Sequence, residues 1–213
     1  MEKDGRSGPD APTIERKVSP PMSIQSLILP EGYHSSLDIL DTEIAIKFVK
    51  DCFERELAAA LNLTRVSAPF FVRPETGLND DLNGVERAVS FDIKELGAQV
   101  QVVHSLAKWK RMALKAYGFR PGFGLYTDMN AIRRDEDLDN LHSVYVDQWD
   151  WEKVITPETR NLETLKETVQ AIVRAMWETQ RQLAVRFPQL PRLFEGEPSP
   201  AFVTAQELED RYP

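Results

Sequence analysis

HSVYVDQWDWEKV, residues 142–154, is the stretch of sequence that decides the fold. Its β-branched and aromatic residues predict a strand, whose side chains alternate between two faces. One face then carries His142, Val144, Val146, Gln148 and Asp150, and the other carries Ser143, Tyr145, Asp147, Trp149 and Trp151. A glutamine and an aspartate share the first face at the end of a hydrophobic run, where a buried acid must find a partner. They either pair with an arginine from a neighbouring strand or belong to a binding site.

Helical and strand-like patterns alternate on both sides of this strand. Two long helices are expected from apolar residues at helical spacing, the first capped by Asp41 or Thr42. Thr204 and Glu207 form a capping-box pattern that predicts another helix start. The pattern favours an α+β fold, an antiparallel β-sheet flanked by helices over one face. The expected elements are helices at 41–63, 107–119 and 161–187, a strand-like run at 64–72 in which Pro69 indicates an edge strand or a bend, a hairpin of 87–93 and 98–105, and a strand from 122.

Composition limits the class of protein. The chain has 213 residues, 42% of them hydrophobic, enough for one core or one core with an appendage. A net charge of −8 argues against a nucleic-acid surface, and no apolar run approaches the ~20 residues of a membrane span. Cys52 is the single cysteine, so no internal disulfide is expected, and no signal-peptide pattern opens the chain. The sequence therefore predicts a cytoplasmic protein, with residues 1–35 as a disordered extension and 36–213 as the folded part.

Four polar clusters are candidates for chemistry. Asn79-Asp80-Asp81 is either a solvated turn or part of a site. HSLAKWKR, residues 104–111, places three cations at an expected helix start that Ser105 would cap. Cations are unfavourable there unless an anion is bound nearby, although a solvated basic face is the alternative. AIRRDED, residues 131–137, is either a self-satisfied surface network or a site, and Gln148 with Asp150 is the fourth cluster. His104 and His142 fit hydrogen-bonded structural residues better than metal ligands.

Several of these segments resemble the aspartate–ammonia ligases, the ammonia-dependent asparagine synthetases. The resemblance rests on VVHSLAKWKR, GLYTDMNAIRRDED and LHSVYVDQWDWEKV, with ALNLTRVSAPFFVRPETGLNDDLNGVERAVSFD before them, and it runs from about residue 33 to the end. It implies a partial catalytic core like that of class II aminoacyl-tRNA synthetases, usually a homodimer. It also implies that L-aspartate, ATP with Mg²⁺, and ammonia give L-asparagine through β-aspartyl-AMP, with release of AMP and diphosphate.

The resemblance also implies residue roles. Arg133 matches the arginine that approaches the α-phosphate, although Arg134 instead satisfies the Arg-x-Glu pattern of the related synthetases, at a position where proline can stand. Asp80 matches the partner of the substrate α-ammonium, and Lys110 is suited to a substrate carboxylate as a compact charge. The implied sets are Arg133 and Lys110 for catalysis; Asp80, Ser105, Lys110 and Gln148 for the amino acid; Arg133, Arg134, Glu136 and Asp150 for the nucleotide; and no metal ligand.

Members of the family continue well beyond the matched part. The sequence therefore favours an incomplete chain of an active ligase, with the metal ligands in the part that is not given. Two alternatives remain: an inactive short product that acts as a nucleotide- or amino-acid-binding or dimerising module, and a ligase for another amino acid. The matches at Asp80, Lys110 and Gln148 make the last of these the weakest.

Overall fold

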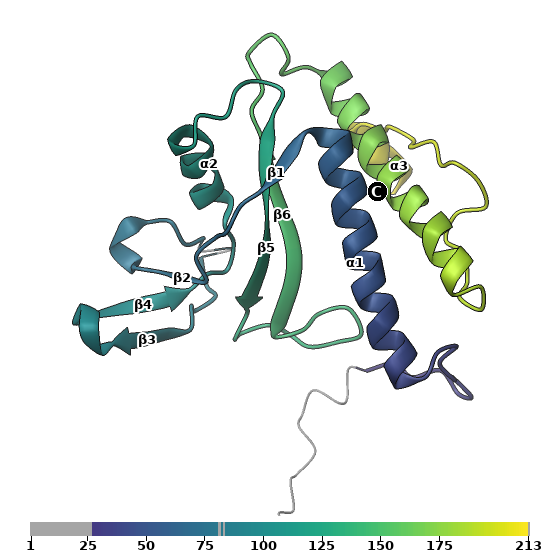
Figure 1. Ribbon diagram of the computed structural model, residues 1–213, viewed down its shortest axis with the longest axis horizontal. Coiled ribbons are helices and arrows are strands. Elements are labelled where there is room, and N and C mark those ends of the chain that lie inside the picture. The colour runs from purple at the N-terminus through teal and green to yellow at the C-terminus, as the bar shows by residue number, and fades with distance from the viewer. Residues whose placement is uncertain (1–26, 81, 83, 213) are drawn as a thin grey trace, which may run out of the picture.

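The computed structural model describes residues 27–80, 82 and 84–212. Its centre is a long antiparallel pair formed by β5 (Gly124–Ile132) and β6 (Tyr145–Lys153) (Figure 1). Gly124 lies opposite Lys153, and Ile132 lies opposite Tyr145. β1 (Leu63–Arg65) pairs with the other edge of β5 in the parallel direction, so the expected all-antiparallel sheet is wrong for this pair. The strand predicted over residues 142–154 is confirmed over nine of its residues.

A second sheet of three antiparallel strands lies beside the first, in the order β2 (Phe71–Val72), β4 (Ala98–Val102) and β3 (Ser90–Ile93). The predicted hairpin is β3 and β4, joined by a 3-10 turn, η3 (Lys94–Leu96), and Gly97. Gly97 adopts a φ of 55°, which glycine reaches without a steric cost. The run around Pro69, expected as an edge strand or a bend, forms two strands, β1 and β2, each at the edge of a different sheet. Another short 3-10 turn, η2 (Pro74–Thr76), follows β2.

Helices cover both faces of the central sheet, which corrects the expectation of helices on one face. α1 (Ile39–Leu61) and α3 (Leu162–Arg186) lie side by side on one face, and α2 (Ala107–Ala116) lies on the other (Figure 1). Two neighbouring residues of β5 show the division, because Leu125 packs in the core beneath α2 while Tyr126 packs with α1 and α3. The α+β class with helix-flanked strands is confirmed.

The helix boundaries follow their caps. α1 begins after Asp38, whose carboxylate accepts from the Asp41 N–H at 2.7 Å, so neither expected residue is the cap. The Asn161 cap of α3 and the capping box that opens α4 (Ala205–Arg211) confirm the two other predicted starts. Within the described part of the chain, none of these helices is both long and apolar enough to cross a membrane.

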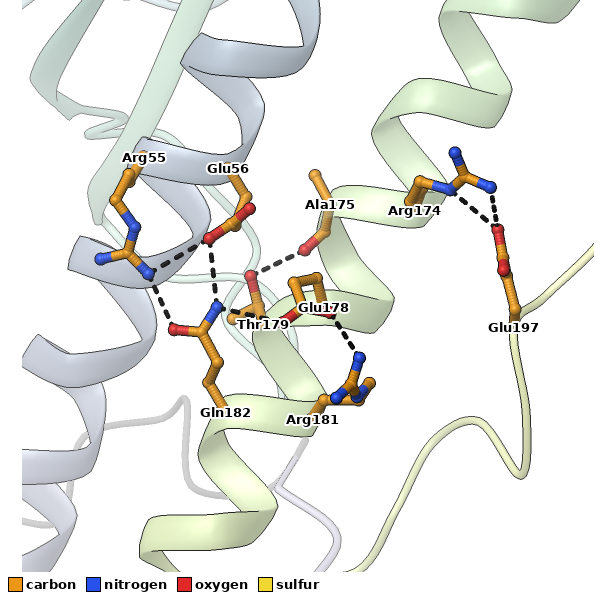
Figure 2. A network of polar contacts seen from close by, with 9 residues as sticks. All are labelled: Arg55, Glu56, Arg174, Ala175, Glu178, Thr179, Arg181, Gln182 and Glu197. Carbon is orange, nitrogen blue, oxygen red and sulfur yellow. Dashed lines mark hydrogen bonds and ion pairs between the residues drawn. The ribbon is translucent and has the colours of Figure 1, made fainter.

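A polar network joins α1 to α3 (Figure 2). The Gln182 amide accepts a hydrogen bond from Arg55 at 2.7 Å and donates one to Glu56 at 3.1 Å. The buried Cys52 thiol also donates to Gln182, at 3.3 Å. These contacts fix the two helices against each other on the sheet face opposite α2.

Candidate functional site

β6 separates a structural face from a polar one. On the first face, Trp149 stacks against Phe53 of α1 at 5.3 Å between ring centroids, and Trp151 packs against the core that α1 and α3 form. The alternation of side chains therefore places Gln148 and Asp150 on the side of α2. Asp150 forms an ion pair there with Lys110 of α2. The distribution of residues between two faces that the sequence predicted is confirmed.

Lys110 is the most deeply buried charged residue described, with a fully buried side chain. Apart from its ion pair with Asp150, its ammonium group has no hydrogen-bond partner among the described residues. Thr127, directly opposite Asp150 in the strand register, is also fully buried, and no other described residue is a partner of its hydroxyl. In the same part of the chain, Gln148 donates to the weak acceptor Sδ of Met129, at 3.1 Å. Polar groups left unsatisfied in a native interior point to a missing water or ligand, so this side of β6 has unused capacity for binding.

The three cations at the start of α2 each have a partner in the chain. Lys108 donates to the Asn79 carbonyl at 3.1 Å, Lys110 pairs with Asp150, and Arg111 lies 3.5 Å from Glu152. The residue that caps α2 is Leu106 rather than Ser105, although the half-buried Ser105 hydroxyl accepts from the Ala107 N–H at 3.2 Å. A bound anion is thus not required to explain the charges, and Lys110 stands apart only by its burial.

A cavity of about 410 Å³ brings together three of the predicted site residues, Asp80, Arg133 and Glu136. Arg133 lies 3.6 Å from Glu136 across a tight turn, and its buried Nε has no partner among the described residues. Arg134, in contrast, is exposed, does not line this cavity, and lies 3.9 Å from Asp135. Of the two candidate arginines, Arg133 is therefore the one that lines the cavity.

Asp135 and His142 also line the cavity, and each is held by a charged partner nearby. Asp135 receives three hydrogen bonds from Arg87, and these hold the pKa of its carboxyl far below the usual range. The Leu141 N–H and the His142 side chain lower the pKa of Asp139 to about 2. The hydrogen bond to Asp139 raises the pKa of His142, which also lines the cavity. No local pattern marks Arg87 or Asp135 as neighbours, because they lie on separate loops.

The predicted residues thus fall into two groups along one strand pair. Asp150, the partner of Lys110, lies opposite Thr127, and Gln148 lies opposite Met129, whereas Arg133 follows the last residue of β5, roughly 13–20 Å further along the strand at ~3.3 Å per residue. Asp80 lines the cavity of Arg133 and also lies near α2, because the carbonyl of its neighbour Asn79 accepts from Lys108. Asp150, expected toward the nucleotide, has its carboxylate on Lys110 instead, and its nucleotide role stays a prediction. Among the described residues, no three histidine, cysteine, aspartate or glutamate side chains gather as metal ligands.

The chain is similar to curated enzymes over most of its length. A sequence model described as aspartate-ammonia ligase matches residues 40–213. An aspartate–ammonia ligase of Ruminiclostridium cellulolyticum is 64% identical over 191 residues, which is 89% of this chain and 56% of that protein. An aspartate–ammonia ligase of Clostridium perfringens is 58% identical over 191 residues, which is 89% of this chain and 56% of that protein. An aspartate–ammonia ligase of Lactobacillus johnsonii is 58% identical over 189 residues, which is 88% of this chain and 56% of that protein. The chain spans about half the length of these relatives.

A solved structure matches the fold. The crystal structure of an ATP phosphoribosyltransferase regulatory subunit/histidyl-tRNA synthetase from Bacillus halodurans C aligns with a TM-score of 0.51 at 12% identity, covering 71% of this chain and 38% of that one. At this identity the likeness concerns the fold alone, and it confirms the class II synthetase-like core that the sequence predicted. With the family match and the close relatives, the chain belongs to the aspartate–ammonia ligase family.

Proposed function

We propose that the chain is the part of an ATP-dependent ligase that binds L-aspartate and activates it for amidation by ammonia. The full reaction gives L-asparagine, AMP and diphosphate through β-aspartyl-AMP. The observation that carries the proposal is the fully buried ammonium group of Lys110, which has donor capacity left unused and pairs with Asp150 on the strand pair that also leads to the cavity of Arg133 and Asp80. The activity named for the curated relatives supports it.

Recognition of aspartate requires complements to one ammonium and two carboxylate groups. Lys110 keeps two N–H donors beyond its ion pair with Asp150, and Gln148 adds an amide beside it. Asp80 lines the cavity, and its carboxylate forms no hydrogen bond or ion pair with another described residue. In this proposal Asp80 receives the α-ammonium group, and Lys110, Gln148 and Ser105 receive the carboxylate end.

Adenylation places negative charge on the α-phosphate while a β-carboxylate oxygen of aspartate forms a bond to phosphorus and diphosphate leaves. The guanidinium group of Arg133, whose buried Nε has no partner among the described residues, would stabilise this charge. Glu136 pairs with Arg133 and would fix its orientation on the nucleotide side. Arg134 and Asp150 remain weaker candidates for contacts with the nucleotide.

Ammonia completes the reaction by forming a bond to the activated carbonyl carbon, with AMP as the leaving group and loss of a proton. ATP supplies the leaving group, so the protein needs no nucleophilic side chain and contributes position and electrostatic field. Mg²⁺ is normally held by the phosphates of ATP and one or two carboxylates. The described residues form no metal cluster of their own, and we assign no metal ligand among them.

A second function has one observation in its favour. The chain spans 56% of the length of a close relative, and the alternative function is a module that binds aspartate or nucleotide without turnover. Both functions are compatible with a homodimer in the cytoplasm, which we retain as part of the proposal.

Formation of AMP and asparagine from ATP, aspartate and ammonium tests the proposal directly. The purified 213-residue chain is compared with Arg133→Lys and with Arg134→Lys as the matched control. Products from the unmutated protein and the control alone would support ligase activity in this chain. A folded chain that binds aspartate in calorimetry without forming AMP would favour the binding module. A folded chain that does neither would refute both.

A further inference from the structure

The main chain of Asp80 is held on both sides by buried side chains. Its N–H donates to Oδ1 of Asn79 at 3.0 Å, and its carbonyl accepts from Nδ1 of His104 at 3.2 Å. Asn79 is 8% exposed and His104 is 2% exposed, so water competes little for either bond. Asp80 itself lies in an irregular segment, outside every helix and strand. These two hydrogen bonds therefore fix the main-chain position from which the Asp80 side chain extends.

Asn79 and His104 are themselves anchored to the end of β4. Oδ1 of Asn79 also accepts from the His104 N–H at 2.8 Å, and its Nδ2 donates to the Val102 carbonyl at 3.2 Å. Lys108 of α2 holds the Asn79 carbonyl at 3.1 Å. We call Asn79 and His104 together the Asp80 bracket. The bracket connects a loop residue to the end of a strand, and its hydrogen bonds agree with the prediction that His104 is a hydrogen-bonded structural residue.

The bond to a carbonyl fixes the chemistry of the His104 ring. A carbonyl only accepts, so Nδ1 of His104 must carry the proton, and in the neutral ring Nε2 is then an acceptor. Nε2 is buried and has no partner among the described residues. The bracket thus uses the main chain of Asp80 and leaves its carboxylate available. A side chain that binds a ligand needs this kind of support from its neighbours, because a shift of the binding group by less than 1 Å weakens recognition of the ligand.

We propose that Asn79 and His104 are positioning residues, which hold the Asp80 carboxylate in place for the α-ammonium group of the bound amino acid. The inference rests on the proposed function and adds to it the residues that hold Asp80 in position to bind the α-ammonium group. His104 acts through the Nδ1–H bond to the Asp80 carbonyl, and Asn79 acts through the Asp80 N–H. Neither residue has to contact the substrate.

Two substitutions at His104 separate this role from general support of the fold. His104→Asn keeps a donor at the δ position and removes the ring atom Nε2, whereas His104→Gln moves the amide to the ε position and removes the δ donor. Calorimetry measures the dissociation constants of L-aspartate and of succinate, which has both carboxylates of aspartate and no ammonium group. We expect His104→Gln to weaken aspartate about tenfold, roughly 1.4 kcal/mol, and to leave succinate unchanged. His104→Asn should stay within about threefold of the unmutated protein for both ligands.

The alternative outcomes are distinguishable. Equal preference for aspartate over succinate in all three proteins would overturn the inference and leave the proposed function intact. A loss of that preference in His104→Asn as well would also overturn it, because the δ donor would then not be sufficient. No binding of aspartate by the unmutated protein would refute the proposed function and the inference with it.

A second measurement does not depend on the variants folding. The ¹⁵N chemical shifts of His104 in the unmutated protein report which ring nitrogen carries the proton. A neutral ring protonated on Nδ1 supports the bracket, and a ring protonated only on Nε2 overturns it.

Discussion

Removal of the Asp150 carboxylate should destabilise the protein more than removal of its partner Lys110. Lys110 is completely buried, whereas the Asp150 side chain is 27% exposed. Asp150→Asn therefore leaves an ammonium group buried without a counter-charge, a change that costs about 3–5 kcal/mol. Lys110→Met leaves a carboxylate that water still reaches and fills a similar volume, so about 1–3 kcal/mol is expected.

Urea unfolding followed by circular dichroism measures both effects. With a denaturant slope of about 2–3 kcal/mol per molar, Asp150→Asn should lower the midpoint by roughly 1–2.5 M. The double variant Lys110→Met/Asp150→Asn should be more stable than Asp150→Asn alone, because the unpaired charge is gone. Equal stability of Asp150→Asn and the unmutated protein, or a double variant less stable than both single variants, would refute the reasoning from burial.

The same pair of variants separates stability from binding. Lys110→Met removes the cation proposed for the substrate carboxylate, so its affinity for aspartate should fall by about 10- to 150-fold, or 1.5–3 kcal/mol for a hydrogen bond to a charged group. Calorimetry without urea, at a temperature well below the unfolding transition, measures this affinity. If Lys110→Met bound aspartate as tightly as the unmutated protein, the substrate carboxylate would not bind at Lys110.

Three further predictions concern the cavity and the sheet. Arg133→Lys should lower the rate of AMP formation about 100-fold or more, while Arg134→Lys changes it little, as measured by chromatography of the nucleotides. The pKa of His142 should exceed 6.5 in an NMR titration and should fall in Asp139→Asn. Any stability that this ion pair provides is therefore complete below pH 6.5, and it is lost as the pH rises through the raised pKa of His142. Gly124→Ala should lower the free energy of unfolding by about 1–3 kcal/mol or more, measured by urea unfolding, because a Cβ would lie 2.8 and 2.9 Å from atoms of β1 and β6.

Local patterns in the sequence were sufficient for the elements that carry a clear period. The two-residue period of β6 separated Trp149 from Asp150 correctly, since alternation is a property of the strand itself. The long helices and the capping box at Thr204 were also predictable, because each depends on residues within a few positions. Asp38 was missed as the cap of α1 because Asp41 and Thr42 are equally suitable by residue type.

Long-range contacts could not be predicted in the same way. Pairing of β1 with β5 in the parallel direction depends on the path of the chain between them, which no local period encodes. The contact of Arg87 with Asp135 spans 48 residues and connects two loops. For the site, the resemblance indicated Asp80 and Arg133, but the support from Asn79 and the place of His142 in the cavity wall emerged only from the structure.

The register of β6 against β5 connects the stability of the fold to the proposed site. A slip of one residue would turn Trp149 toward α2 and bury Asp150 beneath α1 and α3, where Lys110 cannot reach it. A shift of β5 that brought Phe123 or Leu125 to the place of Gly124 is disfavoured, because a Cβ there would lie 2.8 Å from Leu63 of β1 and 2.9 Å from Lys153 of β6. The close strand contact at Gly124 therefore specifies the same arrangement that places Asp150 beside Lys110. For this reason, substitutions at the Gly124 end of the sheet should weaken aspartate binding along with stability, although Gly124 itself contacts no part of the proposed pocket.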